Sequence, residues 1–274
     1  MPIDLHTHSD RSDGTEAPAE VIWAAAVAGI DIVGLADHDT TAGWGEAERA
    51  CATLGIEFVP AVEVSCRWSG MSVHLLALWP SGADEQFLAI IARTRQARIG
   101  RAREIVALLG KDFPLDWEGV VARSTSAATV GRPHIADALV DAGVVATRDA
   151  AFADLLGSDS PYYVPHYAPE VSDAVTAVVA AGGVPVLAHP GADGRGRVLP
   201  DEAIEALAAN GLVGIEVDHR DHSDAQRERL AALASGLGLV RTGSSDYHGT
   251  GKLNRLGENI TSPEAFARLL AARS

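Results

Sequence analysis

Cysteine is scarce in this chain, which has two, Cys51 and Cys66, among 274 residues. Two thiols cannot build a disulfide framework or a zinc site made of cysteines, and they fit a reducing, cytoplasmic compartment. Long apolar runs are also missing, because segments such as Val21–Ile30 fall far short of the roughly 20 residues that span a bilayer. The first residues show no basic segment followed by an apolar one. We therefore expect neither a membrane span nor a secretory signal.

Basic residues are too few to balance the acidic ones, since 22 Lys and Arg face 37 Asp and Glu for a net charge of -15. So acidic a surface repels a long polyanion, and we expect no binding to duplex DNA. A small anion can still bind at a local positive centre such as a metal cluster. The hydrophobic content of 47% supports a buried core and excludes a disordered chain.

Short β-branched segments alternate with helical ones along most of the chain. The expected strands are Ile3–Ser9, Ile30–Leu35, Phe58–Val64, Val73–Leu78, Val184–Leu187, Val213–Val217 and Leu239–Thr242. The expected helices between them are Glu16–Ala28, Ala42–Leu54, Val171–Ala181, Asp201–Asn210 and Asp224–Leu237. This alternation predicts an α/β fold of βα units around a mostly parallel sheet. Six or seven such units favour a barrel over an open sheet.

Residues 84–163 break the alternation because they contain no convincing strand. Helical patterns there cover Glu85–Leu109, Leu115–Ala122, Pro133–Ala142 and Arg148–Leu156. We expect residues 1–83 and 164–274 to form the barrel and residues 84–163 to form a helical insertion that contributes to the active site. Gly and Pro near residues 80–82 and 161–165 mark the boundaries.

Histidines and carboxylates gather at the ends of the apolar strands. His6 and His8 lie two residues apart on the first strand, so both imidazoles share one face. Other such residues follow along the chain: Asp13, His38, Glu63, His74, His189, Asp246 and His248, with His134 opening a helix of the insertion. If these polar groups were buried on a strand without a hydrogen-bond or ion-pair partner, each would destabilise the folded protein by several kcal/mol. One rim of a parallel barrel is where catalytic groups collect, and the set offers too many oxygen and nitrogen ligands for one ion.

The motifs that carry these residues resemble those of the polymerase-and-histidinol-phosphatase (PHP) family. They are His6-Thr7-His8-Ser9, Asp37-His38-Asp39, Glu63, His74, Ala188-His189-Pro190-Gly191 and Gly243-Ser244-Ser245-Asp246-Tyr247-His248, in the family's order. The insertion that supplies His134 resembles the branch of small bacterial enzymes that act on nucleoside 3',5'-bisphosphates and on the 5' ends of short RNAs. The resemblance implies a distorted seven-stranded (β/α) barrel that holds three divalent metal ions.

The same resemblance assigns nine ligands to these ions. The first ion would take His6, His8, Glu63 and Asp246; the second Glu63, His74 and His134; and the third Asp13, His38 and His248. Manganese is the expected metal, with iron or zinc as alternatives, because a set of imidazoles and carboxylates suits all three.

Several further residues are candidates for contact with the substrate. His189 is expected beside the metals as the catalytic group that binds a phosphate oxygen or protonates the leaving group, or else only orients a ligand. Arg132 is the best-placed phosphate ligand, because a planar guanidinium matches paired oxygens. Arg98 and Arg101 share a helix face and either bind the phosphate or form a solvated surface. Weaker or unassigned candidates are Arg67, His166, His219 and His222, and Trp68, Tyr162, Tyr163 and Tyr167 either stack a base or pack in the core.

The expected activity is hydrolysis of a phosphoric monoester in a small nucleotide, such as a nucleoside 3',5'-bisphosphate, by direct attack of a metal-bridging hydroxide. The alternative is a 5'-to-3' exonuclease that acts on short 5'-phosphorylated RNA with the same site. A histidinol phosphatase is less expected, because arginines on the insertion favour an anionic substrate over a cationic one. A non-catalytic PHP module is disfavoured by the complete set of ligands.

Overall fold

A computed structural model describes residues 1–123, 130–157, 159–193 and 198–273. Its strands form one sheet of seven, and each strand pairs with the next along the chain. The strands are β1 (Ile3–Thr7), β2 (Ile32–Leu35), β3 (Glu57–Trp68), β4 (Met71–Leu78), β5 (Val184–Ala188), β6 (Gly214–Asp218) and β7 (Val240–Gly243). All seven lie where the sequence predicts strands, although β3 continues to residue 68 and so forms a hairpin with β4.

The sheet closes almost completely into a barrel. Thr7 at the end of β1 forms a bridge with Tyr247, and the His8 N–H donates to the Tyr247 carbonyl over 2.8 Å. The predicted barrel is therefore confirmed. One strand runs against the others, since β4 pairs antiparallel with both β3 and β5. The start of β4 consequently lies at the same rim as the ends of the parallel strands.

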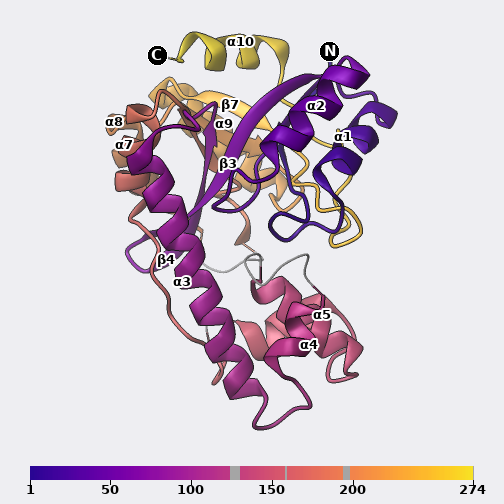
Figure 1. The fold of residues 1–274 in the computed structure, drawn as a ribbon. Coiled ribbons are helices and arrows are strands. Elements are labelled where there is room, and N and C mark those ends of the chain that lie inside the picture. Colours follow the sequence, from indigo (N-terminus) through magenta and orange to yellow (C-terminus); the bar gives the residue numbers. More distant parts are fainter. Residues whose placement is uncertain (124–129, 158, 194–197, 274) are drawn as a thin grey trace.

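Helices cover the outside of the barrel and one of its ends (Figure 1). They are α1 (Pro18–Val27), α2 (Trp44–Leu54), α7 (Val171–Ala180), α8 (Asp201–Ala209), α9 (Asp224–Leu237) and α10 (Pro263–Ala271). The sequence does not predict α10, whose Phe266 and Leu269 pack in one apolar cluster with Ile3, Leu5 and Val186 of the strands. This helix stabilises the end of the barrel that lies away from the strand ends bearing histidine.

The insertion is a separate group of helices that extends from the barrel, with the shorter helices beside the lower half of α3 (Figure 1). It contains α3 (Glu85–Leu109), α4 (Trp117–Val121), α5 (Arg132–Asp141), α6 (Arg148–Ala151) and the π-helix η1 (Phe152–Leu156). It has its own apolar cluster, in which Ile105 and Leu109 of α3 pack against Ile135 and Leu139 of α5. The extent of α3 matches the prediction. Among the described residues, no helix is long and apolar enough to cross a bilayer.

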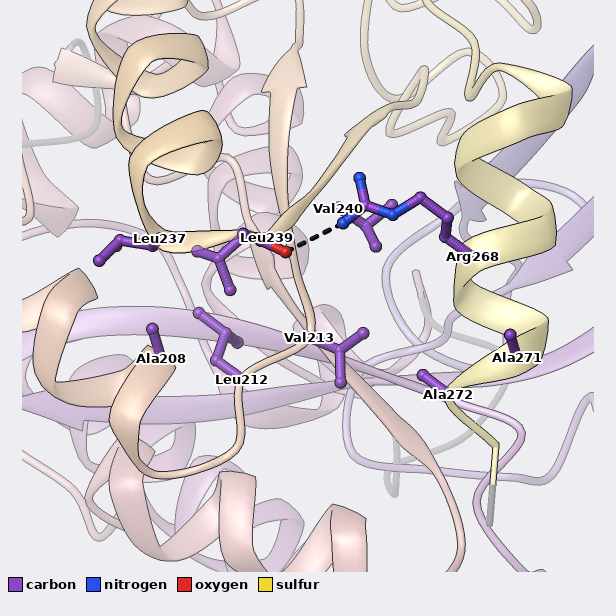
Figure 2. A pocket seen from close by; sticks show the side chains of 10 residues that line it. Ala208, Leu212, Val213, Leu237, Leu239, Val240, Arg268, Ala271 and Ala272 are labelled. Atoms are coloured by element: carbon purple, nitrogen blue, oxygen red, sulfur yellow. Dashed lines mark hydrogen bonds between the residues drawn. The ribbon is translucent and has the colours of Figure 1, made fainter.

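An apolar groove lies between α8, the turn before β7 and α10 (Figure 2). Leu212, Val213 and Leu239 line it, and the Arg268 guanidinium donates to the Gly238 carbonyl over 2.9 Å. The groove is near the start of β7, whereas Asp246 and His248 follow its end. It therefore lies away from the histidines and carboxylates.

Candidate metal centre

The barrel brings the strand-end histidines and carboxylates together at one rim. Glu63 continues the face of β3 that carries buried Val59 and Ala61, and His74 shares a face of β4 with Leu76 and Leu78, as the period of two in a strand requires. Three groups of these residues have potential ligand atoms within 4.8 Å of one another. The groups are His6, His8, Glu63 and Asp246; His8, Asp13 and His38; and His38, Glu63 and His74.

Glu63 lies at the middle of the cluster, with each carboxylate oxygen facing different imidazoles. Its Oε2 is 3.2 Å from His6 Nε2, 3.1 Å from His8 Nε2 and 3.3 Å from His38 Nδ1. Its Oε1 is 2.7 Å from His74 Nδ1. Burial alone would raise the pKa of Glu63, but the surrounding imidazoles hold it well below its ordinary value. The carboxylate stays ionised, as a metal ligand must be.

Asp246 completes the first group. Its Oδ1 lies 3.3 Å from His8 Nε2 and 3.7 Å from His6 Nε2, while Lys252 Nζ lies 2.9 Å from Oδ2. The backbone of Asp246 is left-handed with a φ of 53°. Asp39 and His189, which follow β2 and β5, share this property with φ values of 52° and 28°. Strained backbone of this kind is typical of functional sites.

Asp13 forms the other side of the cluster with His38 and His248. Its Oδ1 is 3.2 Å from His248 Nε2, and its Oδ2 is 3.8 Å from His38 Nε2. Burial would raise the pKa of Asp13, but these histidines hold it well below its ordinary value. His38 Nδ1 and His248 Nε2 are buried beside the carboxylates of Glu63 and Asp13, but among the described residues neither nitrogen has the geometry of a hydrogen bond. Orphaned imidazole nitrogens beside ionised carboxylates fit divalent cations.

The two remaining predicted histidines, His189 and His134, have different surroundings in the structure. His189 Nε2 lies 3.0 Å from Glu63 Oε1, the oxygen that also faces His74. His134 is buried at the start of α5, and its Nδ1 accepts the Gly131 N–H over 3.2 Å. Within the described chain, His134 belongs to none of the three groups. His189 and His248 belong to none of them either, but each lies beside a rim carboxylate. The ion pairs of the described residues join His134 to no carboxylate.

Glu216 is a site residue that the sequence analysis misses. Its Oε1 accepts hydrogen bonds from His6 Nδ1 over 3.0 Å and from the Ser244 hydroxyl, and its Oε2 accepts the His189 N–H over 2.8 Å. A carboxylate that binds one imidazole nitrogen fixes the ring so that the other nitrogen faces a metal. The signal in the sequence is an acidic residue inside the apolar strand Val213–Val217.

We expect Glu216→Gln to weaken metal binding by about 10- to 100-fold, because the amide removes the charge that orients His6 and raises its basicity. Calorimetric titration of the metal-free protein with Mn²⁺ measures this change. Glu205→Gln on the exposed face of α8 is the matched control. Equal affinities of the two variants would contradict the role assigned to Glu216.

The other unassigned histidines near the rim have distinct surroundings. His222 uses both ring nitrogens, because Nδ1 donates to the Val217 carbonyl over 2.9 Å and Nε2 accepts the Gly191 N–H over 3.1 Å. His219 is fully buried, and its Nε2 lies 3.6 Å from Asp246 Oδ2. His222 therefore stabilises the loops after β5 and β6, whereas His219 lies against the candidate ligand Asp246.

Four arginines gather beside the metal centre around His166, and we call Arg67, Arg98, Arg101 and Arg132 the arginine cluster. Burial, together with the charges of all four arginines, lowers the pKa of His166 to about 3. Arg98 pairs with Asp39 and also donates to the Ser65 hydroxyl. The solvated surface considered for Arg98 and Arg101 is wrong, since Arg101 is only 8% exposed and the Arg98 side chain only 18%.

The arginine cluster carries more positive charge than its neighbours neutralise. Arg101 Nε donates to the Val164 carbonyl over 2.8 Å, and Arg132 Nη1 donates to the Leu156 carbonyl over 3.1 Å. Arg67 donates to the carbonyls of His166 and Ala168. In the ion pairs of the described residues, only Arg98 of this cluster meets a carboxylate. Such an excess of guanidinium groups favours binding of an anion.

We expect His166→Asn to reduce the acid sensitivity of the metal-free protein. The folded state keeps His166 neutral down to a pKa of about 3, whereas the unfolded chain binds a proton near pH 6.5. His166 therefore lowers the free energy of unfolding of the wild type as the pH drops from about 6.5 toward 3. The unfolding temperature, measured at pH 7, 6 and 5, should decrease less for the variant than for the wild type. Parallel curves for the two proteins would contradict this contribution.

Comparison with known proteins agrees with this geometry. The sequence profile of the PHP domain matches residues 4–113. A 3',5'-nucleoside bisphosphate phosphatase from Chromobacterium violaceum is 37% identical over 254 residues, which cover 92% of this chain and 89% of the relative. A 5'-3' exoribonuclease from Haemophilus influenzae is 32% identical over 258 residues, which cover 94% of this chain and 93% of the relative.

A solved structure extends the similarity to the whole fold. The crystal structure of a metal-dependent phosphoesterase from Bifidobacterium adolescentis superposes with a TM-score of 0.95 at 42% identity, covering 100% of this chain and 98% of the other. The barrel and the insertion are thus shared with this structure. The chain belongs to the PHP-domain family of metal-dependent phosphoesterases.

Proposed function

We propose that the protein removes one phosphate from a nucleoside 3',5'-bisphosphate. The observation that carries this proposal is the arginine cluster beside a separate cluster of histidines and carboxylates. Arg98 connects the two, because it binds Asp39, the residue after His38, and Ser65, two residues after Glu63. A substrate with two phosphates would place one at the metals and the other at the arginines. The name of the Chromobacterium relative supports the same substrate.

We assign three divalent ions to the rim, with manganese as the expected metal. One would be held by His6, His8, Glu63 and Asp246, and another by Asp13, His38 and His248. For the ion beside Glu63 Oε1 we assign His74 and His189, because both imidazoles lie within 3.0 Å of that oxygen. This replaces His134 of the ligand set expected from the family resemblance. Divalent ions bound there would supply Lewis acidity and an activated water for phosphoester hydrolysis.

The protein's own residues orient the substrate against that centre. His134 has its Nδ1 engaged by the Gly131 N–H, so the neutral ring carries its proton on Nε2. We assign it as a hydrogen-bond donor to the substrate rather than as a metal ligand. Arg101 and Arg132 would bind the second phosphate, because their partners in the protein are carbonyl groups, which do not neutralise the guanidinium charge. Tyr163 is 39% exposed and lies beside Arg101, where it is suited to contact the base.

The second candidate is a 5'-to-3' exonuclease that acts on short RNA with the same centre. The exoribonuclease from Haemophilus influenzae favours it, since that relative covers nearly the same length. The net charge of -15 disfavours long polyanions but not substrates of a few nucleotides. An oligonucleotide would also place a phosphate at the metals and its next phosphate near the arginines.

Product analysis distinguishes the two candidates. The protein is stripped of metal with a chelator, reloaded with Mn²⁺ and supplied with adenosine 3',5'-bisphosphate, a 5'-phosphorylated RNA trinucleotide or histidinol phosphate. We expect inorganic phosphate from the bisphosphate and little turnover of histidinol phosphate. Mononucleotides released from the trinucleotide at a comparable kcat/KM would move the assignment to the exonuclease. No turnover of any nucleotide would overturn both.

A further inference from the structure

Arg148 joins the part of the insertion beyond α3 to the rim of the barrel. Arg148, at the start of α6, binds both carboxylate oxygens of Asp137 on α5, and its Nη1 donates to the Gly251 carbonyl over 2.8 Å. Gly251 lies in the loop after β7, three residues beyond His248. Among hydrogen bonds between described residues, this is the one that links residues 117–157 to residues 1–83 or 164–273.

The bonding of Arg148 differs from that of the arginine cluster. Its Nε, Nη1 and Nη2 each have an acceptor, and the side chain is 22% exposed. Arg101 and Arg132 instead have carbonyl partners and, in the described chain, no carboxylate. Each guanidinium nitrogen of Arg148 thus has an acceptor in the protein and its charge is paired with Asp137, so it is suited to hold two elements together rather than to bind a substrate anion.

The partner of Arg148 lies on the helix that carries two proposed substrate contacts. Asp137 follows Arg132 by five residues and His134 by three on α5. A helix rises about 1.5 Å per residue, so Arg132 lies only roughly 7.5 Å along the axis from Asp137. Fixing Asp137 against the β7 loop therefore fixes the start of α5 relative to Asp13 and His248.

We propose that Arg148 is a positioning residue that seats α5 on the barrel and so sets the separation between the arginine cluster and the metal centre. This rests on the proposed function, because a fixed separation matters for a substrate that binds at both places. A substrate with one phosphate and no second anionic group does not depend on it. Misplacement by about 1 Å costs on the order of 100-fold in rate when two parts of a site act on one substrate.

The test compares Arg148→Met with Arg123→Met. Arg123 pairs with Asp141 of the same helix α5 but has no bond to the barrel among the described residues, so it is a matched control. For Arg148→Met we expect kcat/KM for adenosine 3',5'-bisphosphate to fall by about 10- to 100-fold, with kcat/KM for p-nitrophenyl phosphate within about twofold of the wild type. Arg123→Met should leave both within about twofold. Equal losses on the two substrates, or no loss on either, would overturn the proposal.

A second variant weakens the same link from the barrel. A Cβ on Gly251 would lie 2.7 Å from Arg148 Nη1, so Gly251→Ala displaces the guanidinium while every residue of the insertion keeps its identity. We expect Gly251→Ala, like Arg148→Met, to lower kcat/KM for the bisphosphate relative to kcat/KM for p-nitrophenyl phosphate. A preference equal to that of the wild type would count against the link.

Hydrogen exchange separates this proposal from the proposed function. In Arg148→Met, amides of residues 130–157 should exchange faster than in Arg123→Met, whatever the substrate turns out to be. If the wild type fails to hydrolyse the bisphosphate while exchange accelerates, the proposed function fails and the positioning role stands. If exchange is the same in both variants, the positioning role is overturned.

Discussion

Replacing Glu63 with glutamine is expected to lower kcat/KM for the bisphosphate by about 1000-fold or more, because metal ions contribute several kcal/mol to stabilising the transition state. Both oxygens of Glu63 are engaged: Oε2 lies within 3.3 Å of nitrogens of His6, His8 and His38, and Oε1 lies 2.7 Å from His74. No other residue at the rim faces so many candidate ligands in the described chain. An amide nitrogen in place of one oxygen cannot bind a cation.

The measurement combines kinetics with metal content. Glu63→Gln, reloaded with Mn²⁺ and passed through a desalting column, should hold fewer ions per chain than the wild type. Glu57→Gln is the matched control, because Glu57 lies on the same strand β3 but is exposed. A Glu63→Gln protein with unchanged manganese content and more than a tenth of the wild-type activity would contradict the central place given to this carboxylate.

The second large effect is expected from Arg132→Met and Arg101→Met. A hydrogen bond to a charged group is worth about 1.5–3 kcal/mol, so each variant should lose on the order of 10- to 100-fold in kcat/KM for the bisphosphate. Burial, together with the charges of Arg132 and Arg98, lowers the pKa of Arg101 to about 10. A bound phosphate would relieve this mutual repulsion, which is why the loss should fall on substrates with a second anion.

The control for these variants is Arg103→Met. Arg103 lies two residues beyond Arg101 on α3, but it is exposed and stacks on Trp117 at 4.8 Å. We expect p-nitrophenyl phosphate turnover to stay within about threefold in all three variants. If Arg132→Met and Arg101→Met lose activity equally on the bisphosphate and on p-nitrophenyl phosphate, the cluster stabilises the fold rather than binding a phosphate.

Much of this site can be predicted from the sequence because its ligands interrupt apolar strands. Glu63 and His74 stand out for that reason, and the barrel places both at one rim. The direction of β4 is not encoded in a period of two, so its antiparallel pairing could not be predicted. That pairing sets His74 opposite Ala188, next to His189. The proximity of His189 to Glu63 therefore emerges only from the register of the sheet.

Other features depend on contacts between distant segments. In the sequence, Glu216 is only an acidic residue within a strand. Its role depends on contact with His6, which is 210 positions away in sequence. Arg98 on α3 pairs with buried Asp39 of the barrel, a contact that a helical pattern cannot reveal. The sequence pattern does not predict α10 either, although its apolar residues pack against the strands at one end of the barrel.

The most direct test of the account compares one enzyme on three nucleotides. Phosphate release by the manganese-loaded wild type is measured with adenosine 3',5'-bisphosphate, 5'-AMP and 3'-AMP under the same conditions. If two anion sites act on one substrate, kcat/KM for the bisphosphate should exceed that for either monophosphate by about 100-fold or more. Equal values for the bisphosphate and either monophosphate would contradict the use of the arginine cluster as a second phosphate site.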